Sequence, residues 1–182
     1  IYLGTKESSP VIKETIYLPK EKCGLTIDNF VGDVDEEGTL YKPQALIDEL
    51  NFSGVRNVSD NGMYYAFYYK QLPTETIVFE DLEKITGNNA LEYCFCGSTG
   101  VKKIFFPKLQ IISGASAFNN CFNRSSVEEL HMTGLTEINC NHCFNWLFEA
   151  SDKIKSAFFP KLKKAIGDNV FYDLFWSARV LE

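Results

Sequence analysis

Apolar side chains recur along this chain at a step of about 27 residues, within the range typical of stacked structural repeats. One copy is VKKIFFPKLQIISGASAFNNCF, residues 101–122. Ile104 and Phe106 are separated by one position, which predicts a short strand with one buried face. Pro107 ends that strand because it has no backbone N–H to donate. A single copy cannot bury its own ring of apolar side chains, so each copy needs neighbours.

Five copies share the apolar positions. The first strand position holds Leu50, Ile77, Ile104, Leu130 and Ala157. Two residues further on stand Phe52, Phe79, Phe106, Met132 and Phe159. A later position holds Tyr64, Leu91, Phe118, Phe144 and Phe171, and the last holds Tyr68, Phe95, Phe122, Phe148 and Phe175. Positions that are apolar in every copy predict one continuous interior shared by all copies.

The repeat predicts a solenoid with short parallel strands on one face and short helical turns or loops on the other. Residues 46–182 form the array, with copies that start near residues 50, 77, 104, 130 and 157. Residues 1–45 are expected to form an N-terminal cap. The cap contains a candidate degenerate repeat, because Leu25, Ile27 and Phe30 have the spacing of the first copy's strand.

The copies IFFPKLQIISGASAFNNCF and AFFPKLKKAIGDNVFYDLF resemble BspA-like leucine-rich repeats, with their order of strand, Pro, Leu, Ile-Gly, Ala-Phe and Cys. The resemblance covers residues 46–175, although the copy near residue 130 has Met-Thr-Gly where the family has Pro. It implies an α/β leucine-rich-repeat fold, a right-handed superhelix. It also implies a bacterial cell-surface or secreted protein that binds other macromolecules and carries no catalytic residues.

Composition and charge narrow the range of partners. The 182 residues carry a net charge of −6, which argues against nucleic acid as a ligand. No apolar run approaches the ~20 residues that a membrane-spanning helix needs. The chain begins at Ile1 rather than Met, so we expect a processed or trimmed piece of a surface or secreted protein.

The cysteines fall mainly on repeat positions. Cys94 and Cys121 share a core position, which predicts buried thiols, with a disulfide between them as the alternative. Cys140 and Cys143 have the spacing of a zinc half-site. Zinc is not expected, because a structural site needs four converging ligands and the chain has no second pair. His131 and His142 are expected on different faces of the coil.

An acidic stretch in the cap resembles the start of a calcium loop, with Asp33, Asp35 and Glu37 followed by Gly38. Its twelfth position is Gln44 rather than the bidentate Glu that such a loop requires, so a solvated turn is the better interpretation. The sequence also lacks a nucleophile with a neighbouring base, a pair of catalytic carboxylates, and a phosphate-binding Gly loop. We therefore expect no metal, no cofactor and no enzyme activity.

The strand phase predicts a binding surface. Side chains alternate along a strand, so the residue after each buried aliphatic points outward. This outward column consists of Asn51, Val78, Phe105, His131 and Phe158. The leading hypothesis is protein binding or adhesion through this column. The alternatives are a structural spacer, a carbohydrate-binding module, and self-association through the strand face or the open solenoid end. The next candidate surface, on the opposite wall, consists of Tyr65, Tyr93, Trp146 and Tyr172.

Overall fold

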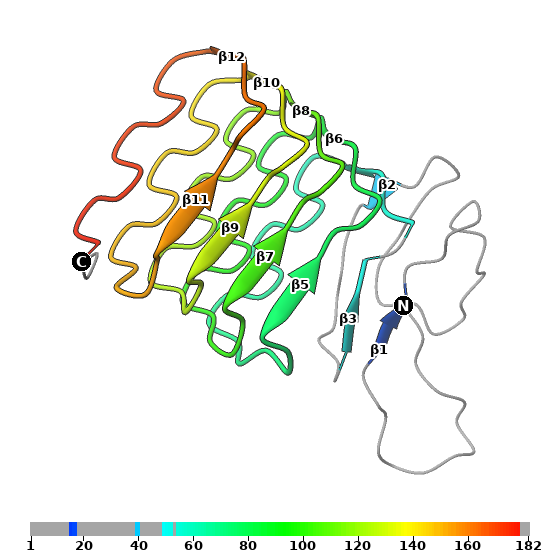
Figure 1. Cartoon of the computed structure of the whole chain (residues 1–182), viewed down its shortest axis with the longest axis vertical. Coiled ribbons are helices and arrows are strands. Elements are labelled where there is room, and N and C mark those ends of the chain that lie inside the picture. The colour runs from blue at the N-terminus through cyan, green and yellow to red at the C-terminus, as the bar shows by residue number, and fades with distance from the viewer. Residues whose placement is uncertain (1–14, 18–38, 41–48, 53, 179–182) are drawn as a thin grey trace.

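The computed structural model describes residues 15–17, 39–40, 49–52 and 54–178, and these form a parallel β-solenoid (Figure 1). One wall is a four-stranded parallel sheet, here called the front sheet, with strand order β11-β9-β7-β5. Its strands are β5 (Thr76–Val78), β7 (Lys103–Phe105), β9 (Glu129–His131) and β11 (Ser156–Phe158). Ile77, Ile104, Leu130 and Ala157 pair in register across it, which confirms the predicted repeat step.

A second parallel sheet forms another wall of the solenoid, here called the second sheet. Its strand order is β12-β10-β8-β6. The strands are β6 (Lys84–Ile85), β8 (Ile111–Ile112), β10 (Glu137–Asn139) and β12 (Lys164–Ile166). The repeat pattern predicts strands on one face alone, so this sheet is an addition to the predicted fold. Each of its strands has two or three residues and one inward position, too short for a period of two to show.

The third wall contains no helix in the part of the chain that the structure describes. Of the two predicted alternatives for this wall, short helical turns or loops, the helical one is therefore wrong. Each coil instead runs through successive β-turns, here called the turn ladder. Cys121 N–H closes a turn by donating to Phe118 O at 3.0 Å, while Phe118 N–H donates to Cys143 O of the next coil at 2.9 Å. Ser116, Asn120 and Arg124 have φ of 55°, 55° and 54°, and a residue in this left-handed conformation cannot continue a right-handed helix.

The strands nearest the N-terminus pair with the first coil of the array. β1 (Thr15–Tyr17) pairs with β3 (Glu49–Asn51), and β2 (Thr39–Leu40) pairs with β4 (Asn57–Val58), both in parallel. The residue that pairs with Leu50 is Ile16. The predicted degenerate repeat of Leu25, Ile27 and Phe30 lies outside the described residues.

Rows of phenylalanine rings fill the interior along the solenoid axis. Phe79 stacks on Phe52 at 4.3 Å and on Phe106 at 4.6 Å between ring centroids. In a second row, Phe122 stacks on Phe95 at 5.6 Å and on Phe148 at 5.5 Å. All these rings are buried. Each coil therefore contributes its rings to the burial of its neighbours, as the shared apolar positions predicted.

In the first coil of the array, two core positions are shifted from the predicted ones. Tyr64 and Tyr68 are exposed, whereas Met63 and Phe67 are buried. Met63 N–H donates to Ala90 O, and this hydrogen bond occupies the same position in the repeat as those donated by the N–H groups of Leu91 and Phe118. The cause is the bend before the turn ladder, which is one residue shorter in this coil than in the next.

Candidate functional site

The predicted outward column lies on the front sheet as expected. Val78, Phe105, His131 and Phe158 are partners in neighbouring strands. The rings of Phe105 and His131 stack at 4.7 Å, and those of His131 and Phe158 lie 6.0 Å apart. Phe158, at an outward position, is 50% exposed. Ile104, at the inward position one residue before Phe105, is fully buried, so the predicted strand phase is confirmed. Asn51 ends β3 and pairs with Tyr17 of β1.

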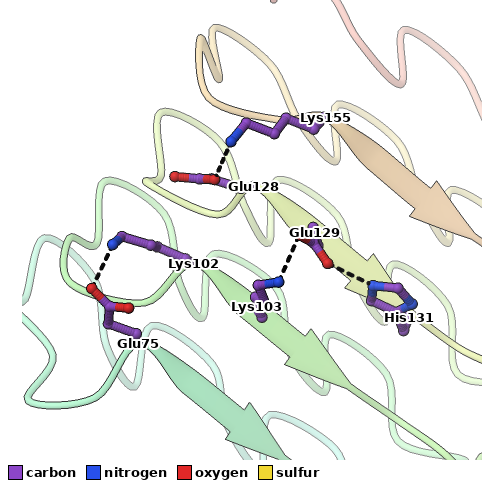
Figure 2. A network of polar contacts seen from close by, with 7 residues as sticks. All are labelled: Glu75, Lys102, Lys103, Glu128, Glu129, His131 and Lys155. Atoms are coloured by element: carbon purple, nitrogen blue, oxygen red, sulfur yellow. Dashed lines mark hydrogen bonds and ion pairs between the residues drawn. The ribbon is translucent and has the colours of Figure 1, made fainter.

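Charged side chains border this column on its N-terminal side (Figure 2). An outer line alternates in sign down the coils as Glu75, Lys102, Glu128 and Lys155. Lys102 pairs with Glu75, and Lys155 Nζ lies 2.5 Å from Glu128 Oε2. The hydrogen bond from Lys155 lowers the pKa of the Glu128 carboxyl. Two ion pairs between coils therefore belong to this line, Glu75 with Lys102 and Glu128 with Lys155, and each is weak because it is exposed.

An inner pair of contacts ties the charged border to the aromatic column. Lys103 Nζ lies 2.8 Å from Glu129 Oε1, and His131 Nε2 lies 3.1 Å from Glu129 Oε2. The hydrogen bonds from Lys103 and His131 lower the pKa of Glu129. His131 is thereby fixed from two sides, by the Glu129 carboxylate and by the stacked Phe105 ring. The front sheet presents a row of ordered rings next to charges that are already paired.

The second candidate surface divides into two clusters on the turn ladder. Tyr65 and Tyr93 stack at 4.7 Å, and Trp146 meets Tyr172 edge-on at 6.2 Å. Burial and the neighbouring tyrosines raise the pKa of Tyr65 to about 12. Asn120 stands at the intervening coil, so these aromatics do not form one continuous row.

A hollow of about 510 Å³ opens between those two clusters, at residues that the sequence pattern does not single out. Aromatic rings of Tyr93, Trp146 and Trp176 line it, together with polar side chains that include Asn123 and Glu149. The signal was present in the repeat: Asn123 is a short polar residue at the position that Tyr68 and Trp176 occupy in other coils. The hollow can be predicted only when the positions of the turn ladder are aligned correctly between coils. The one-residue shift of the first coil hides that alignment.

The cysteines are partly as expected. Cys94 and Cys121 are free and fully buried, and burial raises the pKa of both thiols. The alternative of a disulfide between them is not realised. Cys140 and Cys143 instead form a disulfide with a Cα–Cα distance of 5.7 Å. That bond uses both sulfurs that a zinc site would require as thiolates.

Among the described residues, no group of three or more His, Cys, Asp and Glu side chains converges on a point that could hold a metal ion. His131 lies on the front sheet and His142 on the turn ladder. The acidic residues of the calcium-loop alternative, Asp33, Asp35 and Glu37, lie outside the described residues. A search of the same described part for a helix able to cross a membrane finds none.

Comparison of the chain with protein-family models, with curated proteins and with solved structures gives no match.

Proposed function

We propose that this chain is a non-catalytic binding module, related to the BspA-like leucine-rich repeats, in a bacterial cell-surface or secreted protein. Its ligand is a protein that presents apolar side chains to the front sheet. The observation that carries the proposal is the outward row of Val78, Phe105, His131 and Phe158, in register across four adjacent strands.

This row has the features of a protein-binding surface. Val78 and Phe158 are 37% and 50% exposed, and an apolar strip bordered by polar groups is a common mark of interaction sites. Stacking across the strands holds the rings in place before a partner arrives, which reduces the ordering cost of association. The adjacent charges are paired within the module, so docking leaves the Lys103–Glu129 contact in place and buries mainly apolar surface.

The test compares matched substitutions on two walls of the solenoid. The double variant Phe105→Glu and Phe158→Glu places charge on the front sheet, whereas the control Ile111→Glu places it on the second sheet at a residue that is 41% exposed. Binding is measured by surface plasmon resonance against purified extracellular-matrix and serum proteins, and self-association by sedimentation velocity.

We expect the double variant to stay folded and to lose partner binding at least tenfold, while the control binds like the parent chain. Loss of self-association alone would identify the partner as a second copy of this chain. Unchanged binding of every partner would contradict the proposal and favour a spacer role or another surface. Unfolding of the double variant would show that these rings belong to the core.

A further inference from the structure

The hollow on the turn ladder exists because two neighbouring columns carry short side chains at the same height. The first column, read down the coils, holds Tyr65, Tyr93, Asn120, Trp146 and Asp173. The second column holds Tyr68, Cys96, Asn123, Glu149 and Trp176. Short residues in the middle coils are thus bounded above and below by large rings. The resulting volume of about 510 Å³ lies within the range of small-ligand sites.

The buried amide of Asn123 lies in the wall of this hollow. Asn123 is 6% exposed, and its Nδ2 donates to Asn120 Oδ1 at 2.9 Å and to Glu149 Oε2 at 2.7 Å. These two bonds fix the orientation of the amide. Its Oδ1 accepts no hydrogen bond from any residue that the structure describes. This oxygen is itself enclosed by protein and is not open to a ligand, so the amide contributes by holding the Asn120 and Glu149 side chains in position.

The aromatic rings of the hollow are positioned and accessible. Trp146 Nε1 donates to Asp173 Oδ2 at 3.3 Å, which orients the indole, and 36% of the residue remains exposed. Trp176 is 57% exposed. Tyr93 and Trp146 have φ of 53° and 49°, a conformation that bulky residues rarely adopt. Both rings therefore stand at turn-ladder positions where the backbone conformation by itself favours Asn or Gly.

We propose that the hollow binds a neutral oligosaccharide. A pyranose has an apolar C–H face that lies against flat aromatic rings such as Trp146 and Trp176. Its hydroxyls can donate hydrogen bonds, which suits the carboxylates of Glu149 and Asp173 that line the hollow. Arg124 is the one cation among the lining residues, against the two carboxylates of Glu149 and Asp173, so an anionic sugar or a nucleotide is disfavoured. This site is on a different wall from the front sheet and does not depend on the proposed protein-binding function.

The hollow contains both tryptophans of the chain, Trp146 and Trp176, so tryptophan fluorescence reports on it directly. We would titrate the intact chain with cellohexaose, chitohexaose, mannohexaose, maltohexaose and xylohexaose, with a heparin hexasaccharide as the anionic probe. At least one neutral hexasaccharide should shift or quench the emission saturably, with a dissociation constant below about 1 mM by calorimetry, which is ordinary for a small interface.

Two variants and a matched control locate the binding. Trp146→Ala and Glu149→Gln should each weaken binding at least tenfold, whereas Tyr64→Ala, an exposed aromatic of the same wall outside the hollow, should bind within twofold of the parent chain. Thermal unfolding establishes that each variant is folded. The proposal is overturned if no neutral probe binds, if heparin alone binds, or if Trp146→Ala and Glu149→Gln bind as the parent does. If a variant is unfolded, the titrations of the parent chain decide. Saturable quenching or a shift of the Trp146 and Trp176 emission by a neutral hexasaccharide supports the site, and its absence overturns the proposal.

Discussion

Residues with positive φ stand at every fourth position of the turn ladder, and most of them are not glycine, as at Asn61, Tyr65 and Tyr69. Each costs on the order of 1 kcal/mol relative to a right-handed conformation. The cost is tolerated because, where another coil follows, such a residue turns its N–H toward that coil. Asn61, Tyr65 and Tyr69 donate to Asn88, Glu92 and Cys96 at 2.9, 3.1 and 2.8 Å. Inter-coil hydrogen bonds thus offset a local conformational penalty.

One carboxyl on this wall is held in an unfavourable charge state. Partial burial raises the pKa of Glu92 above its ordinary 4.5, although its Oε1 accepts a hydrogen bond from Asn119 Nδ2 at 2.7 Å. The folded chain therefore holds this proton more tightly than the unfolded chain. The associated stability is present below pH 4.5 and is lost as the pH rises through the folded pKa.

Glu92→Gln keeps the acceptor oxygen and removes the charge. We expect this variant to unfold at a higher urea concentration than the parent at pH 7, because no buried charge has to be desolvated. The difference should shrink at pH 3.5, where the parent's carboxyl is protonated. Glu80→Gln, at an exposed position, serves as the control. A difference that is the same at both pH values would show that the charge of Glu92 is not its cause.

At the scale of elements, the bend between the second sheet and the turn ladder sets how closely coils approach. A side chain at Gly114 would overlap the carbonyl oxygen of Gly87 in the preceding coil. The N–H groups of Gly87 and Gly114 face the preceding coil, toward Val58 O and Ile85 O. At the equivalent position Cys140 N–H instead donates forward to Ile166 O at 2.9 Å. The bend is therefore built differently where a Cβ is present.

Gly114→Ala should destabilise the chain by about 3 kcal/mol, the upper end of the range for overpacking, because backbone atoms cannot move aside as side-chain ends do. Ser113→Ala changes the neighbouring exposed residue and should cost less than about 0.5 kcal/mol. Urea denaturation of both variants measures the difference. Equal stabilities would mean that adjacent coils are further apart at this bend.

The elements differ in how far the sequence predicts them. Strands such as β7 were predictable because Ile104 and Phe106 alternate with outward residues. The turn ladder was not, since left-handed φ at Tyr93 or Trp146 depends on bonds to the neighbouring coil rather than on local preference. For the same reason the outward row of Phe105 and Phe158 was found, whereas the hollow beside Asn123 was not. To locate the hollow, one must know which side chains of three successive coils lie beside one another along the solenoid axis.

For the molecule as a whole, burial depends on the place of a coil in the stack. Phe122 is fully buried between Phe95 and Phe148, at 5.6 and 5.5 Å. Phe175 occupies the same repeat position and stacks on Phe148 at 5.4 Å, but it is 42% exposed. In a quasi-one-dimensional array each coil is stabilised by its immediate neighbours. Residues at the same repeat position should therefore contribute unequally to the free energy of unfolding.

Phe122→Ala should cost about 3–5 kcal/mol, as expected for a ring deleted from a packed interior. Phe175→Ala should cost less than half as much, because one of its faces is already in contact with solvent. Chemical denaturation of the two variants of this 182-residue chain makes the comparison at one repeat position. If both cost the same, stability would not depend on neighbouring coils, and the nearest-neighbour description would be wrong.

The three hydrogen-bonded walls also determine how the molecule responds to force. Bonds between coils in both sheets and in the turn ladder run along the solenoid axis, as in the stack of Figure 1. Tension applied between a tethered end and a ligand on the front sheet would load one inter-coil seam after another. Residues that face each other are 27 apart in pairs such as Glu75 and Lys102. Each coil that peels away would release roughly 90 Å of extended chain. Such a stack would give way in steps of similar length and limit the force that reaches the bound partner.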